Sequence, residues 1–142
     1  MTELSDDIRA RLRRRTPART IERRPDGEAP PMSYAQERLW FMDQYAPGNT
    51  AYTIPLARRI RTAVDPDELS SRLSVIAARH EPLHMRFTPE VVLGDPVVPL
   101  TIATAASEAE ARGLISAFLS DPFDLTTGPV CRAMLVRLAP DD

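Results

Sequence analysis

The sequence has no lysine, a single cysteine and no long hydrophobic run. The lone cysteine, Cys131, excludes an internal disulfide and a zinc site built from cysteine pairs, and we expect a buried thiol. No apolar run approaches the roughly 20 residues of a membrane helix, and the charged amino-terminal end lacks the apolar stretch of a secretory signal. We therefore expect a cytoplasmic protein without a membrane partner. All 18 basic residues are arginine, to which we assign no function.

The composition is that of one globular domain: 142 residues, 43% hydrophobic and 27% charged. Its net charge of -2 conceals an asymmetry, because residues 1–24 are rich in arginine and the remainder is acidic. We predict that residues 1–31 form a basic, proline-rich linker or docking arm and that a folded domain spans 32–142. The acidic folded part argues against nucleic-acid binding. The arginines that would bind an acidic partner are Arg11, Arg13, Arg14 and Arg15.

Three helices are predicted from their capping residues. Ser33 with Gln36 has the spacing of a capping box and predicts a helix over 34–45, which we expect to be well buried because apolar residues cover much of its girth. An aspartate and a proline at 65–66 open a second helix, which ends near His80 because Pro82 follows. A further capping box at 107–110 opens a third helix that ends before residue 121.

Strands are predicted from alternating apolar residues. Residues 52–60 alternate with period two, and Pro55 favours an edge position because it cannot donate to a ladder. Residues 83–87 continue extended, and 91–93 with 97–104 predict a hairpin around a turn at 94–96. Residues 130–138 are apolar enough for a central strand. Together these elements predict an α+β fold, a mixed sheet with helices packed on it.

Three stretches in order resemble the motifs of condensation domains from nonribosomal peptide synthetases, which belong to the chloramphenicol acetyltransferase-like superfamily. The first is similar to the opening helix motif of that family and holds Ser33, Ala35, Gln36, Arg38, Leu39 and Trp40. The second is similar to Arg-His-Glu-x-Leu-Arg-Thr-x-Phe and holds Arg79, His80, Glu81, Leu83 and Phe87. The third holds Pro122, Phe123, Asp124, Leu125 and Gly128, followed by Arg132.

The resemblance implies the amino-terminal lobe of a two-lobed domain, with the second lobe absent. In that family, two carrier proteins bring 4'-phosphopantetheine-tethered substrates into a tunnel, where an aminoacyl amine attacks an upstream acyl or peptidyl thioester and a peptide bond forms. Such synthetases make antibiotics and other secondary metabolites. The catalytic motif, His-His-x-x-x-Asp-Gly, would lie beyond residue 142. We therefore expect no catalytic, metal-binding or cofactor-binding residue in this chain, and no catalysis by it alone.

Individual polar residues have simpler interpretations than catalysis. We expect His80 to be a hydrogen-bonded core histidine, and Ser33 to be a helix cap without a base to activate it. Gln36 and Arg38 should tie their helix to neighbouring backbone, and Trp40 and Phe41 should lie in the core. Turn and capping chemistry accounts for the acidic residues that otherwise suggest paired carboxylates, which are Glu110, Asp121 and Asp124.

His84 stands where the family has an arginine that holds the aspartate of the catalytic motif. A neutral histidine cannot reproduce the fork of hydrogen bonds that an arginine makes. Either Arg86 compensates, or the parent domain is atypical and impaired, a doubt that Met85 in place of threonine strengthens.

Two alternatives to a non-catalytic fragment remain open. In the first, the chain is an interaction module that recognises a carrier protein or an upstream synthetase subunit through its basic arm. Alternatively, it is the small half of a split enzyme, active once the remainder of the condensation domain is supplied by a second polypeptide.

Overall fold

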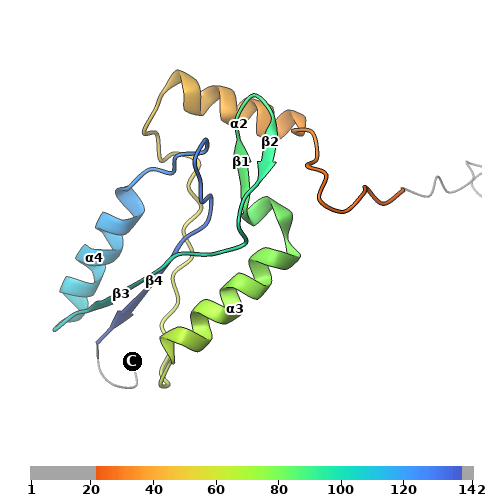
Figure 1. The fold of residues 1–142 in the computed structure, drawn as a ribbon. Coiled ribbons are helices and arrows are strands. Elements are labelled where there is room, and N and C mark those ends of the chain that lie inside the picture. Colours follow the sequence, from red (N-terminus) through yellow and green to blue (C-terminus); the bar gives the residue numbers. More distant parts are fainter. Residues whose placement is uncertain (1–21, 139–142) are drawn as a thin grey trace, which may run out of the picture.

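The computed structural model describes residues 22–138. Helix α2 lies across one end of the molecule beside the hairpin of β1 and β2, while α3 and α4 flank the strands β3 and β4 (Figure 1). A single 3-10 turn, Glu81–Leu83, connects α3 to β1. The elements are α2 Tyr34–Tyr45, α3 Pro66–Arg79, β1 Met85–Phe87, β2 Val91–Leu93, β3 Leu100–Thr104, α4 Glu108–Ser120 and β4 Ala133–Arg137.

The predicted helix starts are confirmed. Ser33 and Gln36 form the reciprocal capping box at the start of α2. The side chain of Asp65 accepts hydrogen bonds from the first free N–H groups of α3. Ser107 caps α4, but the carboxylate of Glu110 accepts from the N–H of residue 106 and not from that of the cap itself.

The predicted hairpin of 91–93 with 97–104 is wrong. Strand β2 pairs antiparallel with β1, so that Arg86 lies opposite Val92, and β3 pairs in parallel with β4 over its whole length. Within residues 22–138 the strands thus form two sheets of two strands each. Pro96 and Pro99 explain the break, because neither can donate a backbone hydrogen bond and the chain between β2 and β3 cannot continue a ladder.

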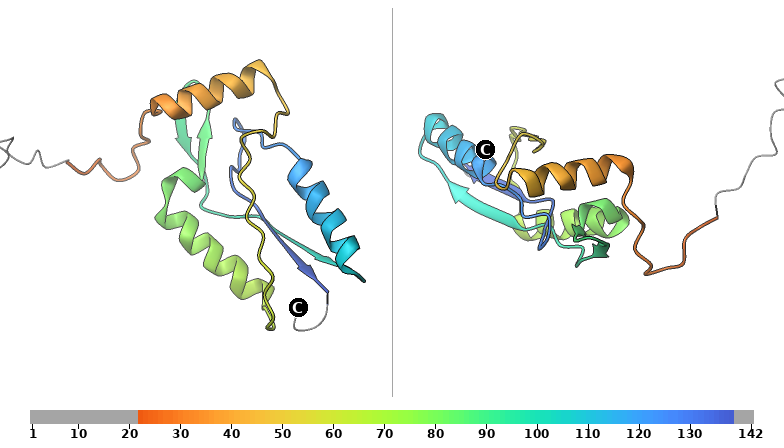
Figure 2. Two further views of the ribbon diagram at one scale, coloured as in Figure 1. Left: turned by 180° about the vertical axis from the view of Figure 1, so that it is seen from behind. Right: turned by 90° about the horizontal axis from the view of Figure 1, so that it is seen from above.

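Residues 52–60 do not form the predicted strand. The chain crosses beside β4 as an extended segment without a strand partner, and it is seen from both sides in Figures 1 and 2. Its large apolar side chains face solvent: Ile54 is 92% exposed and Leu56 is 79% exposed. Likewise β4, expected to be central, has one strand neighbour among the described residues. The predicted strand over 52–60 and the predicted central position of β4 are therefore both wrong among the described residues.

The buried core is small and built largely from small side chains. Its members are Ala77, Met85, Val91, Val98, Ala105 and Ala111. The expectation that α2 is well buried is wrong, since none of its residues is buried and Tyr34 is 91% exposed. The described residues cover one side of α2 and supply nothing for the other sides.

The amino-terminal arm is described only from residue 22 onward, and residues 22–31 form no helix or strand. Arg24 of this part contacts the carboxylate of Glu81 at the start of the second motif. The arginines of the predicted docking arm, Arg11, Arg13, Arg14 and Arg15, lie outside the described residues, so the docking role and the boundary after residue 31 stay predictions.

Candidate functional site

The three motif stretches meet around Phe87, at the end of β1. The indole Nε1 of Trp40 in α2 donates a hydrogen bond of 3.1 Å to the carbonyl oxygen of Phe87. The backbone N–H of Phe87 in turn donates to the carbonyl oxygen of Leu125, with N and O 2.8 Å apart. The second motif therefore binds the first and the third through one residue. We call these residues, with Gln36 and Met85, the motif cluster.

Gln36 belongs both to the helix cap and to the motif cluster. Its Oε1 accepts from the backbone N–H of Ser33 at 2.8 Å, and its Nε2 lies 3.9 Å from the sulfur of the buried Met85. The link from α2 to neighbouring backbone, expected of Gln36 and Arg38, comes instead from Trp40. Arg38 is exposed and makes no hydrogen bond or ion pair with residues 22–138.

The two aromatic residues at 40 and 41 differ in environment. Trp40 is half-buried and its indole N–H is satisfied, as a core position requires. Phe41 is 62% exposed and stacks on Tyr45 with ring centroids 6.3 Å apart. The expectation of a core position is wrong for Phe41, since α2 turns that face to solvent.

His80 is not the core histidine predicted from the sequence. It is exposed and forms the carboxyl-terminal cap of α3 through its backbone N–H. The imidazole makes no hydrogen bond to residues 22–138. Helix α3 ends at Arg79, and the 3-10 turn that leads to β1 begins at Glu81. His80 therefore lies between these two elements and not on the face of α3 that packs on the core.

His84 lies beside Gly94, which follows β2, and Arg86 lies beside both Gly94 and Gly128. Nδ1 of His84 donates to the carbonyl oxygen of Gly94 at 2.9 Å, while its Nε2 is buried without a partner. A Cβ at Gly94 would come within 3.2 Å of Nε of Arg86, and a Cβ at Gly128 within 3.1 Å of its Cγ. Arg86 thus packs against the third motif, and the question whether it replaces the family arginine stays a prediction.

Asp124 organises the loop of the third motif. Its Oδ1 accepts from the N–H groups of Thr126 and Thr127 at 2.8 and 3.2 Å, and its Oδ2 accepts from the hydroxyl of Thr127 at 2.8 Å. The hydroxyl of Thr127, followed by the N–H of Thr126, lowers the pKa of Asp124 below its ordinary value of 3.8. Gly128 then takes the left-handed conformation, with φ of +67°. The expected turn role is confirmed.

Arg132 holds the end of α4 against this loop. Its guanidinium donates to Oδ2 of Asp121 at 2.6 Å and to the carbonyl oxygen of Phe118 at 2.9 Å. It also lies over the rings of Phe118 and Phe123, at 4.9 and 4.4 Å from their centroids. We call these four residues the arginine clamp. Sequence reasoning placed Arg132 in the third motif but missed its aromatic partners.

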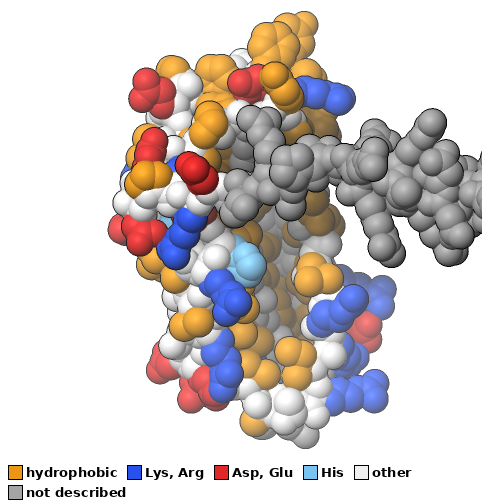
Figure 3. All heavy atoms as spheres, turned by 90° about the vertical axis from the view of Figure 1, so that its right-hand side faces the viewer, with side chains coloured by type: hydrophobic (Ala, Val, Ile, Leu, Met, Phe, Trp, Pro, Cys, Tyr) orange, Lys and Arg blue, Asp and Glu red, His pale blue; other side chains and the backbone are white. Residues whose placement is uncertain are grey.

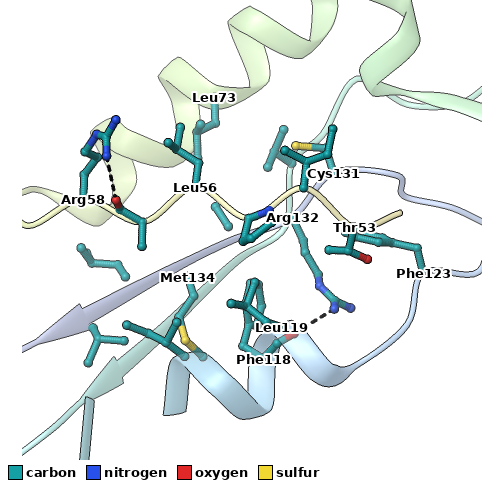
Figure 4. A pocket seen from close by; sticks show the side chains of 18 of the residues that line it. Thr53, Leu56, Arg58, Leu73, Phe118, Leu119, Phe123, Cys131, Arg132 and Met134 are labelled. Atoms are coloured by element: carbon teal, nitrogen blue, oxygen red, sulfur yellow. Dashed lines mark hydrogen bonds between the residues drawn. The ribbon is translucent and has the colours of Figure 1, made fainter. Parts of the chain in front are cut away.

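A groove of about 970 Å³ lies between the extended segment 52–60 and β4, with α4 along its wall (Figure 4). Its lining is mostly apolar and includes Leu56, Leu73, Leu119 and Met134. A space-filling view of one side of the molecule shows a hollow with hydrophobic side chains inside it and basic side chains along its rim (Figure 3). Neither histidine lines the groove.

The titratable side chains that line the groove include the thiol of Cys131. Cys131 is half-buried at its wall, and burial raises the pKa of the thiol, which stays protonated at neutral pH. Within residues 22–138 no three histidine, cysteine, aspartate or glutamate side chains are placed to hold a metal ion. In the same range no helix is both long and apolar enough to cross a membrane.

Residues 28–142 match the family model of the condensation domain. The chain belongs to the condensation domain family. The motif cluster thus joins the three stretches that resemble family motifs, inside the amino-terminal portion of a condensation domain.

The similar curated proteins are large peptide synthetases. Phosphinothricin tripeptide synthetase PhsC of Streptomyces viridochromogenes is 35% identical over 139 residues, covering 89% of this chain and 13% of that protein. Tyrocidine synthase 2 of Brevibacillus parabrevis is 34% identical over 117 residues, covering 77% of this chain and 3% of that protein. This chain therefore spans a small part of the relatives that it matches.

Solved structures confirm the α+β fold class. A point variant of the starter condensation domain of rhizomide synthetase RzmA superposes with a TM-score of 0.69 at 23% identity, covering 78% of this chain and 29% of that one. A doubly substituted variant, solved in complex with C8-CoA and Leu-SNAC, gives a TM-score of 0.64 at 20% identity, covering 78% of this chain and 28% of that one. The match covers the amino-terminal portion of the fold.

Proposed function

We propose that this chain is the amino-terminal part of a peptide-bond-forming condensation domain. The complete domain would join an acyl or peptidyl thioester on an upstream carrier protein to the amine of an aminoacyl thioester on a downstream carrier. The observation that carries this proposal is the convergence of all three motifs on Phe87. Their shared contact means that they form one packed unit, as a common functional domain requires.

The substrate classes are supported by the ligands of a related domain. C8-CoA is an acyl thioester and Leu-SNAC is an aminoacyl thioester, and the RzmA starter domain was solved with both. Both are short mimics of substrates that carrier proteins hold on 4'-phosphopantetheine. We therefore propose carrier-tethered acyl and aminoacyl groups as substrates, and carrier proteins as partners.

We further propose that residues 1–142 do not catalyse this reaction alone. A general base must lie within hydrogen-bond reach of the amine proton. His80 is exposed at the end of α3, and Nδ1 of His84 is already bonded to Gly94 while its Nε2 is buried. No histidine of the described range therefore reaches the groove.

Peptide-bond formation with loaded donor and acceptor carrier proteins tests both statements. We expect no product from the chain alone, and product when the remaining part of the condensation domain is added as a second polypeptide. The matched control is that second polypeptide without this chain. Product from the chain alone would overturn the non-catalytic assignment. Absence of product from the mixture, with the two polypeptides shown to bind, would contradict the proposed contribution to condensation.

A further inference from the structure

The segment that precedes α2 contains a closed turn. The backbone N–H of Glu28 donates to the carbonyl oxygen of Pro25 at 3.3 Å, and Gly27 takes a positive φ of +82°. Glycine is the usual residue at this third position, because it adopts positive φ without strain. Arg23 bridges the same turn through an ion pair of 2.8 Å to Asp26. The sequence Pro-Asp-Gly-Glu therefore encodes the turn locally.

The side chain of Arg24 joins this turn to the second motif. Its Nε donates to the carbonyl oxygen of Glu28, and its Nη2 donates to the carboxylate of Glu81, 57 residues further along the chain. Glu81 begins the 3-10 turn between α3 and β1, and its carbonyl oxygen accepts from the N–H of His84 at 3.0 Å. One guanidinium thus holds two segments, because it has donors on separate nitrogens.

The contact of Arg24 with Glu81 is partly shielded from solvent. The side chain of Arg24 is 32% exposed, whereas that of Arg23 in its pair with Asp26 is 87% exposed. Water and salt screen a shielded pair less than a fully exposed one. Of the two arginines, Arg24 is therefore the one that can hold the turn on the domain.

Both ends of residues 25–32 are fixed. Arg24 holds one end on Glu81, and the capping box of Ser33 holds the other at the start of α2. The half-buried residues between these points are Ala29, Pro30 and Met32. Three of the eight residues are proline, which has few conformations to lose when a segment becomes ordered. The segment is therefore well suited to lie along the domain.

We propose that Arg24 is a latch that fixes residues 22–32 on the second motif, so that the folded unit begins near residue 22 and not at residue 32. The basic arm then leaves the domain beside Glu81. An upstream partner bound by the arm would be held closer to the second motif than a free linker ending at residue 31 would hold it. Arg24 lies before the residues that match the family model, which begin at 28. The latch does not depend on the proposed condensation chemistry.

Limited trypsin digestion of the full 142-residue chain tests the latch with a variant that leaves the cleavage site unchanged. Glu81→Gln removes the carboxylate that binds Arg24 and leaves the sequence around the bond after Arg23 as it is. Cleavage of a segment that opens and closes rapidly follows the population of its open form. We expect cleavage after Arg23 to become about threefold faster, as the loss of one partly exposed ion pair predicts.

Two controls separate the latch from a general loss of stability. Glu68→Gln removes the carboxylate of the exposed ion pair with Arg72 on α3, and it should leave cleavage after Arg23 unchanged. Cleavage after Arg112, inside α4, reports unfolding of the domain and should be equal in the unsubstituted chain and both variants. If Glu81→Gln speeds cleavage after Arg112 as much as cleavage after Arg23, the whole domain has loosened and the latch is contradicted.

An exchange of the two charges tests whether the pair itself is responsible. Arg24→Glu places two carboxylates against each other, and adding Glu81→Arg restores an opposite pair. Both chains have the same sequence around the bond after Arg23, so their cleavage rates are directly comparable. Proline follows position 81, so the introduced arginine adds no efficient trypsin site. We expect cleavage after Arg23 to be about threefold slower in the double variant than in Arg24→Glu. Equal rates in these two chains, or an unchanged rate in Glu81→Gln, would overturn the proposal.

Discussion

The motif cluster and the groove differ in how their polar groups are satisfied. In the motif cluster, helix α2, strand β1 and the loop after α4 are joined by hydrogen bonds through Phe87. At the groove, residues 54–58 make no backbone-to-backbone hydrogen bond to a described residue, and β4 has a described strand neighbour on one edge only. The comparison shows that hydrogen bonds within this chain join the motifs, whereas the described residues supply no strand partner for 54–58 and only one strand neighbour for β4.

Arg132→Ala should show the largest loss of stability, because it removes the arginine clamp beside the motif cluster. The side chain is 15% exposed and loses an ion pair to Asp121, a bond to the carbonyl oxygen of Phe118 and two ring contacts. We expect the free energy of unfolding to fall by about 2–3 kcal/mol. Urea unfolding followed by circular dichroism measures this change.

The matched control for the clamp is Arg72→Ala. Arg72 pairs with Glu68 one turn away on α3, and its side chain is 74% exposed. Such surface pairs contribute about 0.5 kcal/mol or less. Equal effects of the two substitutions would show that the clamp contributes no more than an ordinary surface pair.

Trp40→Phe should have a smaller effect, localised to the motif cluster. It removes the donor to the carbonyl oxygen of Phe87 and keeps an aromatic ring in place. The loss of one half-buried hydrogen bond predicts a decrease of about 1 kcal/mol in the free energy of unfolding. Tyr34→Phe, at an almost fully exposed position of the same helix, is the control and should change stability by less than about 0.5 kcal/mol.

Helix starts and turns, which depend on residues close together in sequence, were predicted correctly. The caps at Ser33, Asp65 and Ser107 define helix starts because a side chain satisfies N–H groups two or three residues away. The turn around Asp124 is local in the same sense. Such features need no knowledge of the remaining chain, and each was confirmed.

The predictions that failed concern which segments lie alongside one another and which faces are covered. Val91–Leu93 was assigned to the following strand, whereas it pairs with β1, because alternation alone does not state which strand lies alongside. The burial of α2 and of His80 was overestimated because an apolar pattern shows what a face could bury, not whether a covering surface is present. Arg132 was placed in its motif, but nothing in the sequence around Phe118 and Phe123 indicates that both rings contact the guanidinium of Arg132.

The segment 52–60 provides the clearest case, because its sequence pattern is that of a strand and it has no strand partner among the described residues. Leu56 is 79% exposed, so Leu56→Ser should change the free energy of unfolding of the chain by less than about 0.5 kcal/mol. It should also reduce self-association, measured by sedimentation velocity, because an exposed apolar side chain is lost. A loss above about 1 kcal/mol would mean that residues 52–60 already pack on β4 in solution, and the groove would then be closed. The unfolding free energy of Leu56→Ser therefore distinguishes a segment whose apolar side chains face solvent from one that packs on β4.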